Sequence, residues 1–497
     1  MSTTTIETAE GRVRGRREGA VLRWRAIPFA APPVAELRFR APQPMPEWAG
    51  VRDATVFAFA AMQHRTGAQL GRTTFQPVSE DCLTLNVTAP AEPSTTPRPV
   101  MVFFHGGGNS FGTSALAMYS GTELVRRGDV LVVSCNYRLG VFGFTDFSEY
   151  GYDSNLGLRD QVAALEWVQR NIAAFGGDPG NVTVFGESAG ALGVTTLLAT
   201  PAAKGLFHRA IAQSPPADWA LDADTARRLA RELLDEAGID PADLGTIEAR
   251  ELGIAAAKAG LRVTRETPGF FVNASVVDGE FLPEAPLSAY RAGRTHPVPL
   301  IAGTCDDEGM LFARFLDQLP TNPKRIERMF DVIDPAYRDR VIAAYPGYPD
   351  RRAAIRLGGD RVFWLPTLRV VEGHSQVAPT YHYRYDYAPM VVRRLGIGAT
   401  HATDLLAVFG LDWLPAATAA SYALDGFRTV RNEVQGHWLA FASSGTPRDN
   451  WPAYTTASRK TLVINKKSTV QQDARRERRL AWSGFGSRYA ADRTTAA

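Results

Sequence analysis

The chain of 497 residues contains 45% hydrophobic and 22% charged residues, which is ordinary usage for a globular protein. This composition excludes a disordered, a collagen-like or a disulfide-scaffold protein. The 55 basic and 52 acidic residues leave a net charge of only +3, so no field of one sign is available to hold a polyanion, and nucleic acid is not an expected partner.

Short apolar runs alternate with amphipathic helical segments along the chain. We predict strands at 83–87, 100–104, 130–135, 182–185 and 298–302. Near-continuous apolar runs of this kind suit strands that are covered on both faces. Helices are predicted over 158–175 and along an apolar stripe that runs from Leu424 to Phe441. This alternation predicts an α/β fold with a large, mostly parallel sheet flanked by helices.

Length alone suggests about three domains, at roughly 150 residues each. One sheet with long insertions can absorb the same length, and we predict a single domain over residues 1–497. Two charged, helical stretches at about 218–265 and 319–371 are the candidate insertions or caps. We expect them near the functional site.

No segment predicts a membrane span or an export signal. The longest purely aliphatic or aromatic stretches, 100–104 and 130–133, are far shorter than the roughly 20 residues of a membrane helix. The N-terminus lacks a basic segment followed by an apolar one. The three cysteines, Cys82, Cys135 and Cys305, cannot all pair and are expected to be buried free thiols. We therefore expect a cytoplasmic protein that does not bind membranes.

The pattern Gly-x-Ser-x-Gly, which is typical of a nucleophilic serine, occurs at 108–112 and at 186–190. Its chemistry requires a sharp strand-to-helix turn that lifts the hydroxyl clear of the sheet. Ser188 follows the predicted strand 182–185 and precedes an apolar, helix-forming stretch. Ser110 follows three glycines and precedes residues that cannot start a stable helix. We therefore predict that Ser188 is the nucleophile and Ser110 a loop residue, and the alternative for Ser188 is a helix N-cap.

A run of three glycines, 106–108, comes directly after the predicted strand 100–104. Consecutive glycines let backbone N–H groups point at one spot without interference from side chains. Such a loop can form an oxyanion hole, the set of donors that stabilises a tetrahedral intermediate. The alternatives are a flexible turn and a phosphate cradle, and the cradle is disfavoured because no Gly-Lys-Ser/Thr follows.

A serine hydroxyl needs a general base, and in this arrangement the acid and then the histidine follow the serine along the chain. Four histidines come late enough: His374, His382, His401 and His437. His401 alone lies in a small-residue loop, 396–403, whose tip can reach across the edge of a sheet. His401 is therefore the favoured base, with His382 second, and the others are expected to be packed or surface histidines.

Three carboxylates, Asp306, Asp307 and Glu308, directly follow the strand-like run that begins at residue 298. An acid at the carboxyl end of a strand would hold the imidazole tautomer and stabilise the imidazolium. Spacing alone does not choose among the three.

Longer segments give the chain a family resemblance. Residues 175–190 resemble the active-serine signature of the type-B carboxylesterases, and residues 80–87 resemble their second signature. Further blocks at 27–30, 136–140 and 277–279 are also similar. This family consists of α/β-hydrolases and includes cholinesterases and bacterial para-nitrobenzyl esterases. The resemblance extends from residue 11 to about 445 and implies the α/β-hydrolase fold and the hydrolysis of carboxylic esters through an acyl-enzyme.

The resemblance also implies roles for individual residues. The segment 307–309 is similar to the family's Asp-Glu-Gly, whose Glu is the triad acid, so Glu308 joins Ser188 and His401 in the implied triad. The implied oxyanion donors are the N–H groups of Gly107, Gly108 and Ala189. The implied supporting residues are Glu187, Ser214 and Asp404. Arg38 and Glu80 resemble a structural ion pair.

The resemblance describes the substrate pocket less well. Asn109 stands where the family usually has an aromatic residue. Met62 stands where secreted members have the cysteine that pairs with the counterpart of Cys82, which implies that this disulfide is absent. The candidate pocket residues, each with a core position as its alternative, are Asn109, Phe111, Trp219, Phe270, Phe271, Phe312 and Phe315.

We predict a small-molecule ester as the substrate and neither a cofactor nor a metal. A carbamate or amide hydrolase with the same triad is the alternative within the enzyme class, and a neuroligin-like binding module is the alternative outside it. The complete set of Ser, Glu, His and glycines argues against the binding module. The sequence is compatible with a monomer but does not predict the oligomeric state. The arginine-rich run 475–479 is interpreted as a solvated surface.

Overall fold

The computed structural model describes residues 3–70, 74–316, 318–410 and 426–486. The strands within these ranges are β1 (Thr3–Thr8), β2 (Gly11–Glu18), β3 (Val21–Pro28), β4 (Val51–Asp53), β5 (Thr84–Pro90), β6 (Arg98–Phe104), β7 (Leu131–Cys135), β8 (Gly177–Glu187), β9 (Arg209–Gln213), β10 (Ala220–Asp222), β11 (Ser275–Val277), β12 (Leu300–Cys305), β13 (Thr380–Tyr385), β14 (Lys460–Ile464) and β15 (Thr469–Gln472).

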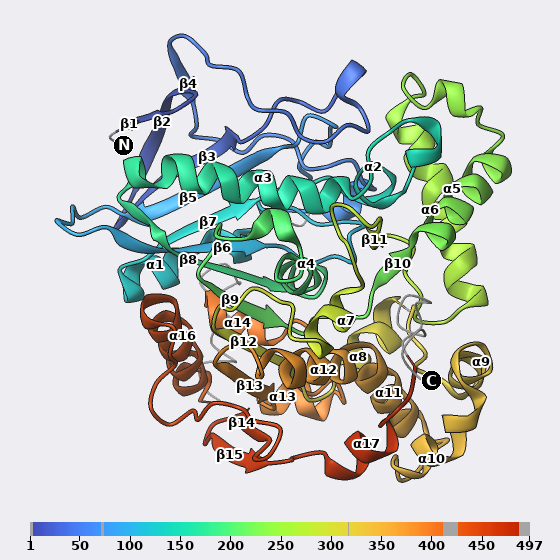
Figure 1. Cartoon of the computed structure of the whole chain (residues 1–497). Helices are drawn as coiled ribbons and strands as arrows, with labels where there is room; N and C mark the ends of the chain where they lie inside the picture. The colour runs from blue at the N-terminus through green and yellow to red at the C-terminus, as the bar shows by residue number, and fades with distance from the viewer. Residues whose placement is uncertain (1–2, 71–73, 317, 411–425, 487–497) are drawn as a thin grey trace.

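A 13-stranded sheet in these described ranges runs through the whole molecule (Figure 1). Its order is β1-β2-β3-β5-β7-β6-β8-β9-β12-β13-β14-β15, and β4 pairs with β2. Every neighbouring pair from β7 to β14 is parallel, whereas the row from β1 to β7 and the pair β14-β15 are antiparallel. The predicted large, mostly parallel sheet is therefore present.

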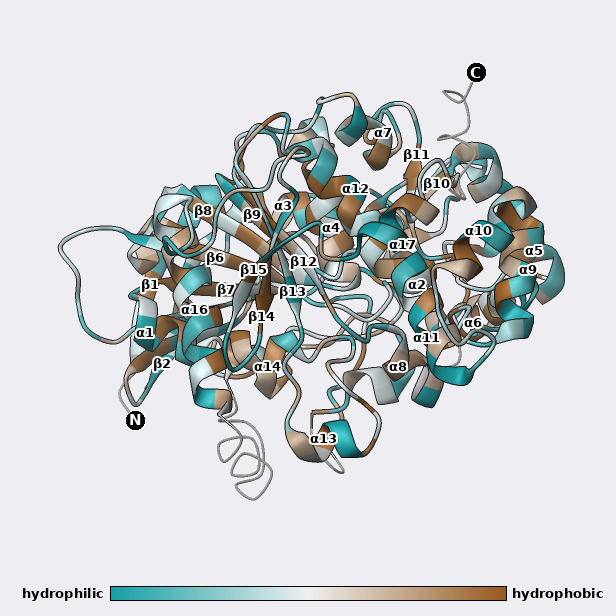
Figure 2. Cartoon of the chain, turned by 90° about the horizontal axis from the view of Figure 1, so that it is seen from below, coloured by the Kyte–Doolittle hydropathy of each residue, from teal (hydrophilic) through white to brown (hydrophobic). Residues whose placement is uncertain are grey.

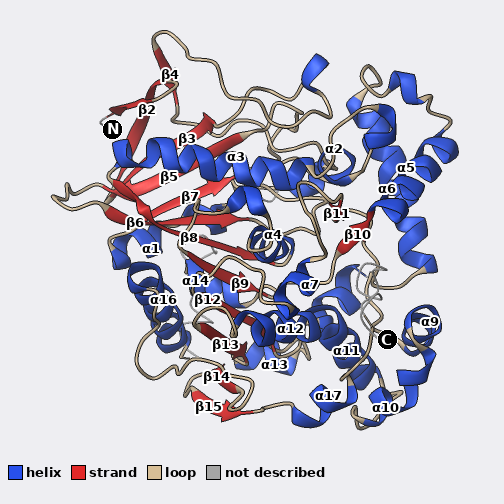
Figure 3. Cartoon of the chain, in the orientation of Figure 1, coloured by secondary structure: helices blue, strands red, loops and turns tan. Residues whose placement is uncertain are grey.

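The helices lie along this sheet and at one end of it (Figure 3). They are α1 (Thr122–Gly128), α2 (Gly140–Phe144), α3 (Leu156–Asn171), α4 (Ala189–Leu197), α5 (Ala223–Ala237), α6 (Ala249–Glu266), α7 (Pro286–Arg291), α8 (Gly309–Leu311), α9 (Pro323–Ile333), α10 (Arg338–Ala343), α11 (Arg351–Gly359), α12 (Leu365–His374), α13 (Met390–Arg394), α14 (Asp404–Phe409), α16 (Phe427–Ser444) and α17 (Arg476–Ala481). Two π-helical turns, η8 (Phe312–Leu316) and η10 (Asp360–Trp364), adjoin α8 and α12.

Strand β6 shows why the central strands are apolar without alternation. Val100, Val102 and Phe104 join the hydrophobic cluster on one face of the sheet, while Met101 and Phe103 join the cluster on the other face. Helices α3, α4, α7 and α12 complete the first cluster, and α1, α14 and α16 complete the second. Because both faces are covered, the side chains from Val100 to Phe104 are all buried, and Figure 2 shows apolar strands between helices with polar outer surfaces.

The predicted strands agree with β5, β6, β7, β8 and β12, and the predicted helix 158–175 agrees with α3 and the 3-10 turn that follows it. The C-terminal apolar stripe forms α16, although its first residue, Leu424, lies outside the described residues.

The two predicted insertions are mainly helical. The stretch 319–371 contains α9, α10, α11 and most of α12. The stretch 218–265 contains α5 and most of α6, but the prediction that it is helical throughout is wrong at its start. There β10 pairs in parallel with β11 as a separate two-stranded sheet. In both Figures 1 and 2, α5, α6, α9 and α11 lie together at one end of the large sheet.

The interpretation of 475–479 as a solvated surface is wrong for its first residue. The side chain of Arg475 is only 7% exposed and forms ion pairs with Asp306 and Asp360. A guanidinium enters the interior in this way only when carboxylates pair with it, and the sequence alone does not indicate such distant partners.

The three cysteines are free and buried, as predicted. Among the described residues no helix combines the length and the apolar character that a membrane crossing requires.

Two ion pairs with little solvent exposure hold the loops around the sheet, and the second of them, which is buried, reaches α3. Arg38 pairs with Glu80, as the family resemblance implies. Arg138, which follows β7, donates to Asp160 of α3 through its backbone N–H (2.9 Å), Nε (2.8 Å) and Nη2 (2.7 Å). The side chains of Arg138 and Asp160 are 4% and 0% exposed.

We expect Asp160→Asn to lower the free energy of unfolding by about 3–5 kcal/mol, because it leaves the Arg138 guanidinium buried without a counterion. Urea denaturation would measure the change. The control is Asp53→Asn, which removes a carboxylate from an exposed pair with Arg14 and should leave the midpoint unchanged within error. A small, equal effect in both variants would contradict the prediction.

Candidate active site

Ser188 lies at a sharp turn between β8 and α4, as predicted. Its backbone has φ 57° and ψ −123°, a conformation that is strained for a residue with a side chain. Two glycines make the turn possible, since a Cβ on Gly186 would lie 2.5 Å from the carbonyl carbon of Gly190, and one on Gly190 would lie 2.0 Å from the carbonyl oxygen of Phe104. Ser188 stands at the N-cap position of α4, but its side chain forms no capping hydrogen bond. The N-cap role is therefore not what holds this serine.

The glycine loop after β6 packs against this turn. A Cβ on Gly106 would lie 2.8 Å from Oε2 of Glu187 and 3.1 Å from Cβ of Ser188. Gly107 and Gly108 have positive φ values of 117° and 60°. Within the described residues, neither of their amide N–H groups donates a hydrogen bond to the protein. Two free backbone donors therefore lie in the loop that borders Ser188.

Ser110 lies in the same loop, as predicted. Its hydroxyl donates to the carbonyl oxygen of Gly108 (3.0 Å) and accepts from the side chain of Asn273 (2.8 Å). The hydroxyl of Ser188 forms no hydrogen bond among the described residues, and the residue is 9% exposed. Of the two serines in the repeated pattern, only Ser188 has a hydroxyl without a partner.

The imidazole of His401 contacts the carboxylate of Glu308. The distance between Nδ1 and Oε2 is 2.6 Å, and both side chains are buried. Because an ionised carboxylate only accepts, the tautomer with its proton on Nδ1 fits this contact. The second oxygen of Glu308 accepts from the hydroxyl of Ser214 (2.6 Å) and from the backbone N–H of Cys305 (2.6 Å).

The other two candidate acids point away from this imidazole. Asp306 pairs with Arg475, and Asp307 pairs with Arg356 at 2.9 Å. The geometry therefore distinguishes three carboxylates that spacing leaves equivalent.

The remaining candidate histidines have structural partners elsewhere. His374 in α12 contacts the Thr295 hydroxyl and a backbone carbonyl, and His382 in β13 contacts the hydroxyl of Thr461. His437 lies in α16 and accepts from the backbone N–H of Arg448 (3.2 Å).

The other edge of the His401 ring faces the turn that carries Ser188. Nε2 lies 3.1 Å from Oε1 of Glu187, the residue immediately before Ser188, and forms no hydrogen bond. No hydrogen bond joins Ser188 to His401 in the structure. Nε2 of His401 thus lies beside Glu187, the chain neighbour of Ser188, and is not bonded to the Ser188 hydroxyl.

Asp404 lies behind this turn. Its Oδ2 accepts from Nε2 of Gln213 (2.9 Å) and from the hydroxyl of Tyr383 (2.7 Å), and the backbone carbonyl of Gln213 accepts from the N–H of Ser188 (2.9 Å). Burial raises the pKa of Asp404. This residue supports the turn through Gln213 and does not touch the imidazole of His401 through a hydrogen bond.

Comparisons with known proteins agree with this geometry. A model of the Carboxylesterase family matches residues 2–482. The para-nitrobenzyl esterase of Bacillus subtilis (strain 168) is 36% identical over 488 residues, covering 96% of this chain and 98% of that protein. The cocaine esterase of Oryctolagus cuniculus is 31% identical and covers 96% and 94%.

The chain belongs to the carboxylesterase family.

Solved structures extend the likeness to the fold. A PNB esterase has a TM-score of 0.85 at 35% identity, and a Geobacillus stearothermophilus carboxylesterase has 0.84 at 36%, each covering 97% of this chain and 100% of its own. The fold is therefore that of an α/β-hydrolase, and the protein is a carboxylic ester hydrolase whose family acts on small-molecule esters.

Several carboxylates surround the imidazole of His401 in this esterase. Burial lowers the pKa of His401, but the negative charges of Glu187 and Glu308 outweigh it and raise that pKa to about 9. Burial also raises the pKa of Glu187, to about 8. In the described residues no group of three or more His, Cys, Asp or Glu side chains is arranged to hold a metal ion.

An apolar cluster adjoins the imidazole. The ring of Phe312, a predicted pocket residue, is 5.2 Å from that of His401, and the ring of Phe363 is 4.2 Å away. Phe312 and Phe363 share this cluster with Leu192 of α4. Phe363 was not predicted, because a phenylalanine inside an apolar helix reads as core and nothing local shows that it faces a distant histidine.

The other predicted pocket residues divide into two groups. Trp219 and Phe270 are buried in the same cluster, and Phe271 stacks on Trp219 with ring centroids 3.7 Å apart. Phe111 is 42% exposed, and Asn109 is buried and donates to the carbonyl oxygen of Asn273. The side chain of Phe315 lies outside the described residues.

We expect the kcat/KM of the esterase to rise with pH toward about 9, because only the neutral form of His401 can accept a proton. Glu187→Gln removes a negative charge beside Nε2, which lowers the pKa of His401 and should move this ascending limb to lower pH by about one unit. Initial rates on a para-nitrophenyl ester from about pH 5 to 10 would measure it.

The matched control for this shift is Glu149→Gln, which removes a surface carboxylate paired with Arg231. It should leave the limb in place. An unmoved limb in Glu187→Gln would show that Glu187 does not set the protonation of His401.

Proposed function

We propose that Ser188, His401 and Glu308 form the catalytic triad of this carboxylesterase, and that esters are hydrolysed through an acyl-enzyme on Ser188. The observation that carries the proposal is the 2.6 Å contact between Glu308 and Nδ1 of His401. That contact leaves Nε2 free at the turn that carries the unbonded serine hydroxyl.

In the proposed first step, Oγ of Ser188 attacks the ester carbonyl carbon while Nε2 of His401 takes the hydroxyl proton. Glu308 keeps the Nδ1 proton in place and stabilises the imidazolium that forms. Ser214 and the N–H of Cys305 hold Glu308 in the orientation this requires. The carboxylate therefore acts by positioning and by charge.

The tetrahedral intermediate carries its negative charge on the former carbonyl oxygen. We assign the N–H groups of Gly107, Gly108 and Ala189 as its donors. The free amides of the two glycines and the contact between Gly106 and Ser188 support this assignment. Losing one such donor typically raises the barrier by about 3 kcal/mol.

The collapse of this intermediate breaks the bond to the alcohol. The imidazolium of His401 gives its proton to the leaving alkoxide, and the acyl group stays on Ser188. Water then attacks the acyl-enzyme with His401 again as the base, which releases the carboxylic acid and restores the serine. Atoms and charges balance without a cofactor.

The proposed mechanism needs a hydrogen bond between Ser188 and His401 that is not formed in the structure without substrate. Such bonds are often long or poorly aligned in free enzymes and tighten in the Michaelis complex. The Ser188 hydroxyl has no competing capping hydrogen bond to release when this bond forms.

The apolar cluster beside His401 supports a substrate that presents an apolar group to the site. Phe312, Phe363 and Leu192 belong to one apolar cluster that offers no counterion, so an acyl or alcohol group bound beside it would be favoured when uncharged.

We further propose that the chain is one domain, since the large sheet takes its edge strands, β1 and β15, from opposite ends of the described chain. A cytoplasmic location is likewise proposed, and the three buried free thiols support it. The near balance of basic and acidic residues supports a protein without a nucleic-acid partner.

We expect Ser188→Ala to lower the turnover of a para-nitrophenyl ester by about a thousandfold or more, because it removes the proposed nucleophile and the hydroxyl of Ser110 is engaged by Gly108 and Asn273. The thermal midpoint should stay nearly unchanged or rise slightly, because the hydroxyl makes no hydrogen bond. A fluorophosphonate should label the wild type at Ser188 and leave this variant unlabelled.

Ser110→Ala is the matched control, since it changes the serine of the second copy of the pattern. It should keep both turnover and labelling. A fluorophosphonate adduct on Ser110, or full activity in Ser188→Ala, would refute the assignment. A wild type without any labelling or ester turnover would instead favour a binding module.

A further inference from the structure

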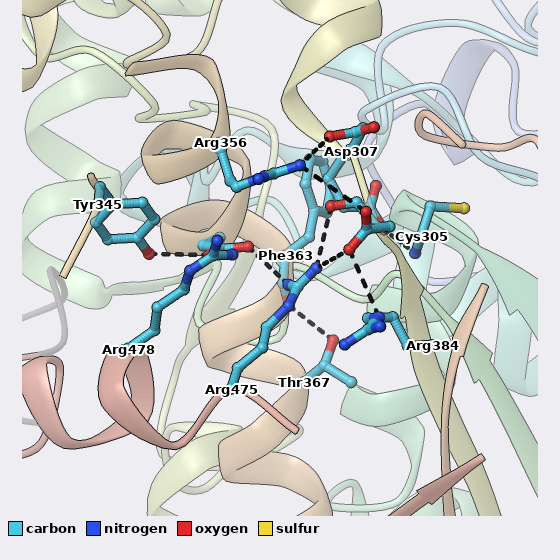
Figure 4. A network of polar contacts seen from close by, with 12 residues as sticks. Cys305, Asp307, Tyr345, Arg356, Phe363, Thr367, Arg384, Arg475 and Arg478 are labelled. Carbon is cyan, nitrogen blue, oxygen red and sulfur yellow. Dashed lines mark hydrogen bonds and ion pairs between the residues drawn. The ribbon is translucent and has the colours of Figure 1, made fainter. Parts of the chain in front are cut away.

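Arg475 is a buried arginine that reaches the active-site region from the C-terminal part of the described chain. It stands immediately before α17, and its side chain is 7% exposed. Figure 4 shows Arg475 and Arg384 approaching one cluster of carboxylate oxygens from different sides, beside Cys305 at the end of β12. Neither arginine was predicted to contribute to the site.

One end of the guanidinium holds the segment that carries the proposed acid. Nη2 of Arg475 donates to Oδ1 of Asp306 (2.6 Å) and to the backbone carbonyl of the same residue (3.1 Å). Asp306 is two positions before Glu308. Because Arg475 grips both the side chain and the backbone of Asp306, it restrains the direction in which the chain leaves β12.

The same short segment is tied to the loop that carries His401. The backbone N–H of Asp307 donates to the carbonyl of Ala399 (2.9 Å), and that of Leu311 donates to the hydroxyl of Thr400 (2.8 Å). A shift at Asp306 would therefore move the proposed acid and the histidine loop together or pull them apart.

The other end of the guanidinium holds the π-helical turn η10. Nη1 of Arg475 donates to Oδ1 of Asp360 (2.8 Å), the first residue of η10. Three positions later in the turn is Phe363, whose ring packs 4.2 Å from that of His401. The Arg475 guanidinium thus joins two segments that contact the imidazole of His401. The segment after β12 contacts Nδ1 through Glu308, and η10 contacts the ring through Phe363.

We propose that Arg475 is a positioning residue for ester hydrolysis, which fixes Glu308 and Phe363 relative to each other around the imidazole of His401. This inference rests on the triad proposed above. Without the guanidinium, Asp306 and Asp360 lose the counterion that they share and repel each other. The Asp306 carboxylate then keeps the longer ion pairs with Arg384 (3.5 Å) and Arg356 (3.9 Å), and its backbone N–H still donates to the carbonyl of Tyr385 (3.0 Å).

Arg478 offers a control that distinguishes two roles for Arg475. One role is to position the acid segment, and the other is only to anchor the C-terminal segment. It donates to Oδ2 of Asp360 (3.0 Å), where the hydroxyl of Tyr345 also donates (2.9 Å), and its guanidinium lies over the Tyr345 ring. It makes no contact with Asp306 among the interactions of the described residues. Arg478 therefore shares the anchor at η10 and lacks the link to the acid segment.

The test compares Arg475→Met with Arg478→Met in the full chain, with a para-nitrophenyl ester as the probe and fluorophosphonate titration to count competent sites. We expect Arg475→Met to lower kcat per titrated site about tenfold or more with KM within about twofold, since small displacements of catalytic groups act on kcat. Its ascending limb of kcat/KM should move to lower pH as Glu308 loosens from His401. Arg478→Met should lower the thermal midpoint and leave kcat and the limb unchanged.

Asp306→Asn tests the same link if Arg475→Met does not fold, because it keeps the Arg475–Asp360 pair and weakens the contact of Arg475 with the acid segment, together with the longer ion pairs of Asp306 with Arg384 and Arg356. It should reduce kcat and move the limb in the same direction. Unchanged kcat and pH limb in Asp306→Asn or in folded Arg475→Met, or an equal loss of kcat in Arg478→Met, would overturn the inference. A wild type that neither turns over the ester nor is labelled would refute the proposed triad instead.

Discussion

The backbone at Ser188 holds φ 57° and ψ −123°, which costs about 1–3 kcal/mol for a residue with a Cβ. Close packing around Ser188 offsets this cost. Gly186 and Gly190 approach each other, and Gly190 approaches the end of β6, so closely that a side chain on either glycine would not fit. The same packing brings the glycine loop against the turn and directs the serine away from the sheet. The imidazole of His401 reaches this bend at Glu187 from the loop before α14, Glu308 contacts that imidazole from the end of β12, and the free amides lie in the loop after β6.

Charge is the second constraint on the site. The buried imidazole of His401 lies among Glu187, Glu308 and Asp404, and the negative charges of these carboxylates raise its pKa above the usual value. The environment that stabilises an imidazolium during attack therefore also favours it before attack. Burial offsets part of this effect by raising the pKa of Glu187 and of Asp404, so that fewer negative charges are present at low pH. The proposed base is thus tuned by several neighbours rather than by its triad partner alone.

Much of this arrangement was predictable from the sequence, for a physical reason in each case. Apolar runs predicted the central strands because those strands are covered on both faces. The glycine spacing predicted the bend at Ser188 because a residue with a side chain does not fit at Gly186 or Gly190. Spacing did not separate the three carboxylates after β12, because their side chains diverge by geometry that spacing does not encode, and only the family resemblance singled out Glu308. Phe363 and Arg475 were missed because their partners are remote in the chain. The apolar sequence around Phe363 is typical of a core residue, and the charged run around Arg475 is typical of an exposed surface.

The order of strands in the sheet has a consequence for biosynthesis. β13 is paired on one side with β12, and its other partner, β14, lies far later in the chain, after α14 and α16. While the polypeptide emerges from the ribosome, β13 therefore presents an unpaired edge of backbone N–H and C=O groups, next to a face that bears Tyr381, Tyr383 and Tyr385, until β14 has been made. An unpaired edge of this kind is a template for association with other nascent chains. Slow translation between these two strands would lengthen that exposure, and holding chaperones would act on it.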